Sequence, residues 1–242
     1  MTKLTTSTTS KHTTTSDITS YTLHPLSKEY MQSTADLFIK TFCSSEPITK
    51  HLGIQHHEFE PFVMDVIQKV IKDGMGMVAV DKNNRVIACA MGEDIANPFV
   101  PNLSLYPKMK TVFALINKLS EPFLKDKKFV KGKIVHIWVA MVDNNYRGLG
   151  LSTIIDLACT EMCARKGFDF TYAEFTNEIS EKITHHYSVA KKINAISLDD
   201  FTFQGTQPLK GLKGAATAYI LGIKPGVTID SLKDCYIMGK KS

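Results

Sequence analysis

A turn with two glycines is the part of this sequence best suited to hold an anion. Arg147-Gly148-Leu149-Gly150 follows an apolar stretch, Ile134 to Val142, and precedes an amphipathic helical pattern that begins at Leu151. Glycine has no Cβ atom, so a ligand can come close to the backbone there. Free N–H groups at the start of a helix can then converge on one anion, helped by the helix dipole. We therefore expect this turn to bind a pyrophosphate.

The spacing of the turn differs from two common nucleotide-binding motifs. A dinucleotide fold has three glycines spaced GxGxxG, and an NTPase loop has Lys followed by Ser or Thr after its last glycine. Asn145 to Gly150 instead resembles the acetyl-CoA loop of the GNAT superfamily of N-acetyltransferases, Q/R-x-x-G-x-G/A, with Asn145 at the first position. The resemblance implies acetyl-CoA as cosubstrate. It also implies two sets of backbone contacts: the pantetheine arm on Ala140, Met141 and Val142, and the pyrophosphate on Arg147, Gly148, Leu149, Gly150, Leu151 and Ser152.

Glu46 is the first candidate for a general base. Pro47 disfavours helix at the residue before it, so the sequence places this carboxylate on an irregular turn. Ser45-Glu46-Pro47-Ile48, with Leu52-Gly53-Ile54 after it, resembles the D-E-P-L…L-G segment of insect-type arylalkylamine and dopamine N-acetyltransferases. The Glu of that segment is their general base, so the resemblance implies this role for Glu46. The alternative is that Glu46 only caps the next helix or lies in solvent.

His136 is the rival base. It lies in the apolar stretch with the same side-chain parity as Trp138, and an imidazole suits proton transfer at neutral pH. Related vertebrate serotonin N-acetyltransferases have two His at alternate positions of this strand, and the second corresponds to Trp138 here. The alternative is a hydrogen-bonded core histidine.

The departing thiolate also needs a proton or a hydrogen-bond donor. Asn177-Glu-Ile-Ser180 resembles the family's N-x-x-S/A helix start, which implies that Asn177 contacts the cofactor, but the family's usual Tyr seven residues on is Thr184 here. Insect-type enzymes have two Ser at i and i+4 in this region, and the matching positions are Thr176 and Ser180. Tyr187 is a further candidate acid.

The amino-acid composition favours a cytoplasmic domain with no nucleic-acid, membrane or metal partner. The 242 residues are 43% hydrophobic, enough for one large domain, and no apolar run reaches the roughly 20 residues that span a bilayer. The five Cys are odd in number and scattered, which favours a reduced, cytoplasmic protein. The net charge is only +5, with Lys spread along the chain, so we expect neither a nucleic-acid nor a membrane partner. No Cys or carboxylate stands at ligand spacing from His185 and His186, so we expect no metal.

The order of the patterns predicts the domain organisation. Residues 1–19 are a Thr/Ser-rich tail that we expect to be disordered, and 20–242 form a single acyl-CoA N-acyltransferase domain with an insertion at about 94–132. The insertion contains a helical pattern bounded by Pro107 and Pro122, which we expect to lie over the acceptor site. The remaining expected elements are strands at 21–26, 77–80, 86–91, 134–142, 168–175, 195–203 and 215–223, and helices from 27, across 59–70, from 151 and over 177–191.

Together these patterns predict an α/β fold, a GNAT-like mixed central β-sheet with helices on both faces. The expected activity is direct acetyl transfer from acetyl-CoA to a primary amine of a small molecule, of the arylalkylamine or polyamine type, by a monomer or homodimer. Phe42, Trp138, Phe175 and Phe203 could line an aromatic pocket or belong to the core. Two alternatives stay open: a protein N-acetyltransferase and a non-catalytic CoA-binding regulatory domain.

Overall fold

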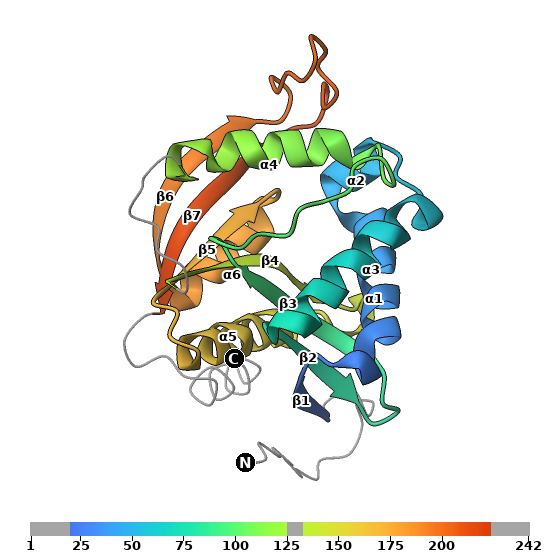
Figure 1. The fold of residues 1–242 in the computed structure, drawn as a ribbon, viewed down its shortest axis with the longest axis vertical. Coiled ribbons are helices and arrows are strands. Elements are labelled where there is room, and N and C mark those ends of the chain that lie inside the picture. The colour runs from blue at the N-terminus through green and yellow to red at the C-terminus, as the bar shows by residue number, and fades with distance from the viewer. Residues whose placement is uncertain (1–19, 125–132, 224–242) are drawn as a thin grey trace.

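The apolar stretches assigned to strands pair into one seven-stranded mixed sheet with helices on both faces (Figure 1). The computed structural model describes residues 20–124 and 133–223, so the predicted Thr/Ser-rich tail and the end of the predicted insertion lie outside the described residues. The strand order is β1-β2-β3-β4-β5-β7-β6, and every neighbouring pair is antiparallel except β4 and β5. The strands are β1 Tyr21–Pro25, β2 Gly76–Asp81, β3 Val86–Asp94, β4 Ile134–Val142, β5 Phe170–Phe175, β6 Ser188–Ser197 and β7 Ala215–Ile223.

Helices cover the sheet from two sides. In Figure 1, α1 and α3 lie together beside β3, α4 runs along β6 and β7, and α5 crosses below the centre of the sheet. The helices are α1 Met31–Ser45, α2 Pro47–His51, α3 His56–Asp73, α4 Met109–Leu124, α5 Leu151–Arg165 and α6 Glu178–Tyr187, with short 3-10 turns at Lys28–Tyr30 and Asn144–Tyr146. This arrangement confirms the predicted mixed α/β fold.

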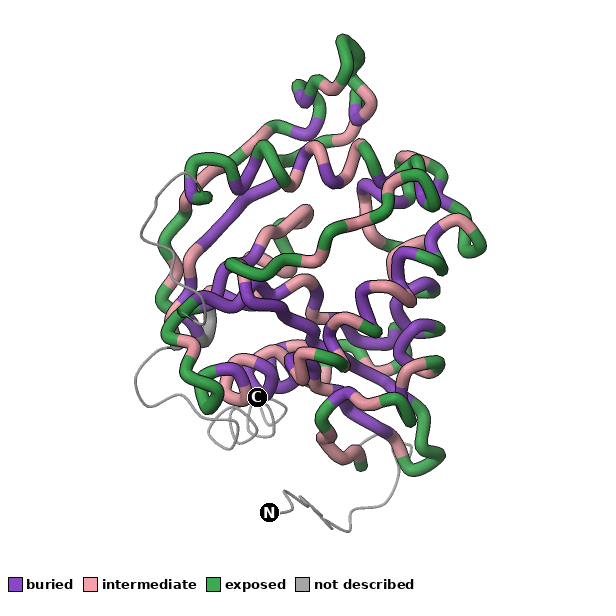
Figure 2. The backbone as a smooth tube through the Cα atoms, in the orientation of Figure 1, coloured by how far each residue is buried: buried purple, intermediate pink, exposed green. Residues whose placement is uncertain are grey.

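The core has one apolar layer on each face of the sheet. Alternating strand residues explain this division: Val78 and Cys89 pack towards α1 and α3, whereas Ala79 and Ala88 pack towards α5. Figure 2 shows the same pattern, with buried segments in the central strands and the inner sides of the helices, and exposed residues at the protruding loop between β6 and β7. No helix among the described residues is long and apolar enough to cross a bilayer.

Two predicted boundaries were wrong. The helix expected over 177–191 ends at Tyr187, and the strand expected at 195–203 is β6, which runs from Ser188 to Ser197. β6 pairs with β7 along its whole length, and these long-range hydrogen bonds outweigh the local pattern. The segment after β6 instead forms turns, with a single bridge between Phe203 and Thr206.

Helix α4 also continues through Pro122, where we expected it to end. A proline cannot donate to the carbonyl four residues before it, which here belongs to Lys118. The side-chain amide of Asn194 on β6 donates to the carbonyl oxygens of Lys118 and Leu119, at 3.4 and 3.0 Å. A neighbouring strand thus supplies the donor that the proline lacks.

Strand β4 contains one extra residue. Met91 of β3 lies opposite Val139, but the next residue, Gly92, lies opposite Ile137, so Trp138 forms a β-bulge. Trp138 and Val139 both pack with the α1–α3 layer as a result. The parallel pairing with β5 covers only Ile134 to Ile137. Beyond the bulge, β4 therefore has no ladder partner on its β5 side among the described residues.

The bulge predicts that Gly92 is needed for stability. A Cβ atom at Gly92 would lie 2.8 Å from Val135 Cγ2 and 3.2 Å from both the His136 carbonyl oxygen and Ile137 Cδ1. We expect Gly92→Ala to lower the free energy of unfolding by about 1–3 kcal/mol, measured by urea denaturation. Gly222→Ala on β7 is the matched control, since its Cβ would meet no atom within 4 Å. Equal stability of the two variants would contradict this account of the bulge.

Candidate active site

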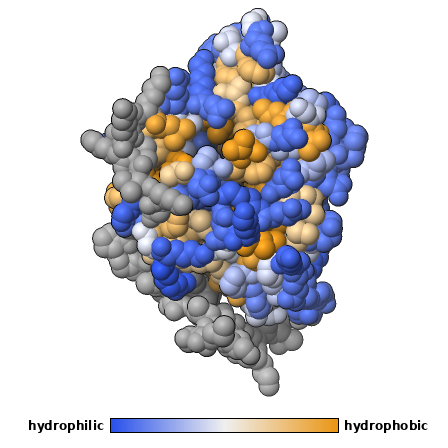
Figure 3. Space-filling model, viewed as in Figure 1, coloured by the Kyte–Doolittle hydropathy of each residue, from blue (hydrophilic) through white to orange (hydrophobic). Residues whose placement is uncertain are grey.

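A cavity of about 820 Å³ opens where β4 and β5 diverge. Its size is that of a small-molecule site. One part of the cavity faces α1, α2 and α4, and the other part faces the glycine turn, α5 and α6. The space-filling view shows apolar side chains that reach the surface between hydrophilic ones (Figure 3). Residues from both parts line it, including Phe42, Glu46, Phe59, Phe62, Val112, Phe113, His136, Trp138, Ala140, Met141, Val142, Arg147, Gly148, Gly150, Leu151, Ser152, Asp156, Glu174, Thr176, Asn177, Ser180 and Thr184.

The glycine turn has the geometry of an open amide nest. Gly148 and Gly150 have left-handed backbones, with φ of 77° and 71°, and Gly150 is the N-cap of α5. The first N–H groups of a helix have no partner within it, and a glycine cap offers no side chain to fill that role. A Cβ on Gly148 would enter open space. The predicted residues Arg147, Gly148, Gly150, Leu151 and Ser152 thus face the cavity; Leu149 is not among its lining residues.

A polar network fixes the entry to this turn. The Asp143 carboxylate, directly after β4, accepts the Asn145 N–H at 3.0 Å and the Lys40 ammonium of α1 at 3.1 Å. Those contacts hold the pKa of Asp143 below its usual range despite burial. Tyr146 then donates its hydroxyl to Asp81 at 3.2 Å. The turn is therefore tied to α1 and to β2.

The predicted pantetheine segment lies where an extended ligand could add to the sheet. Ala140, Met141 and Val142 line the cavity and pair with β3 on one side. On the other side they lie beyond the four residues that pair with β5. Their backbone groups can therefore bind a ligand as an added strand would.

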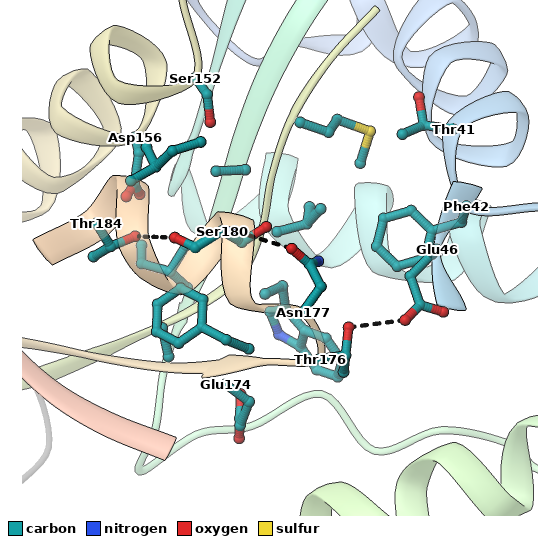
Figure 4. Close-up of a pocket in the computed structure, with 18 of the residues that line it drawn as sticks. Thr41, Phe42, Glu46, Ser152, Asp156, Glu174, Thr176, Asn177, Ser180 and Thr184 are labelled. Carbon is teal, nitrogen blue, oxygen red and sulfur yellow. Dashed lines mark hydrogen bonds between the residues drawn. The ribbon is translucent and has the colours of Figure 1, made fainter. Parts of the chain in front are cut away.

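Glu46 is held at the start of α2 by three donors. Pro47 occupies the first helical position, and the Glu46 carboxylate accepts the N–H groups of Ile48 and Thr49 at 3.2 and 2.6 Å. The third donor is the hydroxyl of Thr176, 2.8 Å away (Figure 4). A carboxylate has about four acceptor positions. One position of Glu46 therefore stays open for water or an amine.

Thr176 reaches Glu46 from the loop between β5 and α6, so the fold joins two predicted catalytic residues that are far apart in the sequence. The next residue, Asn177, caps α6 by accepting the Ser180 N–H at 2.9 Å. Ser180 lines the same cavity, and the Thr184 hydroxyl donates to its carbonyl oxygen at 3.1 Å (Figure 4). Thr184, which the sequence resemblance matches to the family's Tyr, also lines the cavity. The side chain of the other candidate acid, Tyr187, lies outside the described part of the structure.

His136 is enclosed by two carboxylates. Its Nδ1 lies 3.2 Å from Glu93 Oε1 on β3, and its Nε2 lies 2.7 Å from Glu174 Oε2 on β5. Burial on its own would lower the pKa of His136, but the charges and hydrogen bonds of Glu174 and Glu93 outweigh it and raise the pKa to about 10. The ring is therefore an imidazolium at neutral pH, with both nitrogens donating.

A wall of aromatic rings adjoins this histidine. Phe42, Phe59, Phe62, Phe113 and Trp138 all line the cavity, and neighbouring ring centroids in the series lie 5.4–6.3 Å apart. The His136 ring lies 5.0 Å from that of Trp138. Of the other aromatic residues suggested by the sequence, Phe175 lines the cavity but Phe203 does not.

The sequence analysis missed three carboxylates: Glu93, Glu174 and Asp156. Glu93 and Glu174 stand in otherwise apolar strands, and that signal was available in the sequence. Asp156 lies on α5 one turn after Ser152 and faces the cavity (Figure 4). Burial raises the pKa of Asp156 to about 7, so at neutral pH this carboxyl is divided between its neutral and ionised forms. Among the described residues no group of His, Cys, Asp and Glu is arranged to hold a metal ion.

Solved structures with similar folds include N-acetyltransferases and a condensation domain. The C-terminal condensation domain of Ebony, solved with beta-alanyl-dopamine, has a TM-score of 0.72 at 15% identity, over 84% of this chain and 99% of that one. Arylalkylamine N-acetyltransferase 2 from Aedes aegypti has a TM-score of 0.69 at 16% identity, over 84% and 98%. The Drosophila melanogaster polyamine N-acetyltransferase has a TM-score of 0.62 at 13% identity, over 84% and 100%.

No protein-family model and no curated protein sequence matches the chain. At sequence identities this low, the similarity to these solved structures concerns the fold alone. The mixed sheet with helices on both faces matches the GNAT-like α/β fold of these N-acetyltransferase structures, as the sequence predicted. The chain has the GNAT fold.

Proposed function

We propose that this protein is an acetyl-CoA-dependent N-acetyltransferase that acetylates the primary amine of a small molecule directly. One observation carries the proposal: the Glu46–Thr176 pair and the amide nest at 147–152 face the same cavity. The first offers a positioned base and the second offers an anion site for the cosubstrate, and acetyl transfer to an amine needs both.

The nest and the open edge of β4 would bind the cosubstrate. The amides at Gly148 to Ser152 suit a pyrophosphate, and Ala140 to Val142 suit an extended arm with alternating amide groups. Acetyl-CoA supplies the activated thioester when it is bound. Residues of the chain then orient it along β4, towards the bulge at Trp138.

Glu46 accepts a proton from the bound ammonium through its remaining acceptor position, directly or through one water. Thr176 holds the carboxylate in place by donating to it, and the N-terminus of α2 stabilises the charge that Glu46 carries beforehand. Ser180, in the first turn of α6, lines the cavity, and its hydroxyl would donate a hydrogen bond to the departing thiolate. His136 is a fixed cation in this scheme and not the base, because both its nitrogens are engaged.

The shape of the cavity favours a small acceptor over a protein. Helix α4, which belongs to the predicted insertion, contributes Met109, Val112, Phe113 and Ile116 to the lining, and this supports a covered acceptor side. The aromatic wall suits the apolar part of an arylalkylamine or of a diamine.

We expect Glu46→Gln to lower the rate of thiol release by roughly 10²-fold or more at neutral pH, because the amide cannot accept the proton. Affinity for acetyl-CoA should stay within about twofold. Release is followed with a thiol-reactive dye and a panel of aryl amines and diamines, and a thermal melt checks that α2 keeps its cap. Glu60→Gln, an exposed carboxylate on α3, is the matched control and should leave the rate unchanged. An unchanged rate in Glu46→Gln would remove this residue from the role of base.

The proposed CoA site at the amide nest gives a second prediction, which concerns the affinity for CoA and not the rate of acetyl transfer. Gly148→Ala puts a Cβ into the open space of the nest and forces alanine into a left-handed backbone that costs about 1 kcal/mol. We expect CoA to bind at least about tenfold more weakly, measured by calorimetry.

Gly205→Ala is the matched control for that prediction. Gly205 has φ of 75° and open space at its Cβ, like Gly148, but it lies in the protruding loop after β6. It carries the same backbone strain, and CoA affinity should be unchanged. Equal affinity of both variants would show that the nest is not the CoA site.

A further inference from the structure

The acceptor part of the cavity has a surplus of negative charge. Two carboxylates, Glu93 and Glu174, share one imidazole, His136, so acidic groups outnumber basic groups by one in this triad. Glu46 adds a second acidic group in excess. Apart from His136, Arg147 is the one Lys, Arg or His among the lining residues that the structure describes, and it belongs to the glycine turn.

The two negative charges have different fates during amine acetylation. Glu46 becomes neutral when it takes the proton of the reacting ammonium, and the attacking amine becomes neutral with it. The triad keeps its charge, because His136 holds both carboxylates by hydrogen bonds. A charge in a desolvated cavity is costly unless an opposite charge lies near it. An acceptor with one amine cannot balance the triad once that amine has lost its proton.

We propose that Glu174, positioned by His136 and Glu93, selects acceptors that carry a second cationic group: diamines with an apolar spacer. The inference rests on the proposed function and names the acceptor class for the same cavity. The reacting amine lies at Glu46, and the second ammonium lies against Glu174, which balances the triad throughout the reaction.

The positions of the residues fit this geometry. Glu174 lies in β5 and Thr176 directly follows the last residue of that strand, and residues two apart in an extended chain lie about 7 Å apart. Thr176 donates to Glu46, and Glu174 lines the same cavity, so a diamine with a short spacer could contact both carboxylates. The aromatic wall runs beside this path, because Trp138 packs on both Phe113 and the His136 ring. An alkyl or aryl spacer would lie against these rings.

The experiment compares 1,4-diaminobutane with butylamine, which has the same length and one charge. Binding of each amine is measured by calorimetry with CoA present, and turnover is measured by thiol release. We expect the unaltered protein to bind the diamine at least about tenfold more tightly. In Glu174→Gln this preference should fall to about twofold or less, through KM and not through kcat, while values for butylamine stay within about threefold.

A second variant keeps the proposal testable if Glu174→Gln folds poorly. Glu93→Gln removes the same unit of charge from a residue that is not among the cavity-lining residues, and it should weaken the diamine preference in the same direction. A thermal melt identifies any loss of folding, and Glu60→Gln again serves as the exposed control. An effect of the triad on packing alone would lower binding of both amines equally.

The outcomes separate the two proposals. Diamine-selective binding that is lost in Glu174→Gln supports the inference even if no amine causes thiol release, and in that case the proposed transferase function fails. Thiol release with butylamine equal to or better than with the diamine supports the transferase function and overturns the inference. Equal losses for both amines in Glu174→Gln also overturn it.

Discussion

One extra residue in β4 is the constraint on which the cavity depends. A regular parallel pair would keep β4 and β5 hydrogen-bonded to their ends and leave no room between them. The bulge at Trp138 bends β4 after four paired residues, and Gly92 on β3 provides the space for that bend, since three atoms of β4 lie close to the position that a Cβ atom at Gly92 would take. The separation of the strands then exposes the backbone of Ala140 to Val142 on one side.

Three helix N-termini meet at this opening, each for a reason visible in the local sequence. Helix α5 begins at the left-handed Gly150, α6 begins at the cap Asn177, and α2 begins after Glu46 with Pro47 in its first position. Since β4 and β5 are parallel, the turns that follow them lie at the same edge of the sheet, which brings α5 and α6 together. Each N-terminus favours negative charge. Two could therefore serve an anionic ligand, while the third holds the carboxylate of Glu46.

The parts that the sequence predicted are those with local causes. The glycine turn, the carboxylate before Pro47 and the apolar face of α3 depend on residues next to one another in the chain, and all three lie where expected. The bulge, the start of β6 and the passage of α4 through Pro122 depend on partners far away in the sequence. Pairing with β7 determines where β6 starts, and the amide of Asn194 allows α4 to continue through Pro122. Neither partner is part of the local sequence pattern.

His136 shows why residue type alone could not identify the base. An isolated imidazole has a pKa suited to proton transfer at neutral pH. Here the neighbouring strands β3 and β5 each place a carboxylate on it, so the same side chain becomes a permanent cation that organises two negative charges. Glu46 has the opposite environment: neutral donors hold it, and it makes no ion pair with any residue that the structure describes. A carboxylate that is positioned but not paired with a cation can still accept a proton, whereas an imidazolium with both nitrogens donating cannot. The proposed division of work between Glu46 and His136 therefore rests on which charges surround each residue.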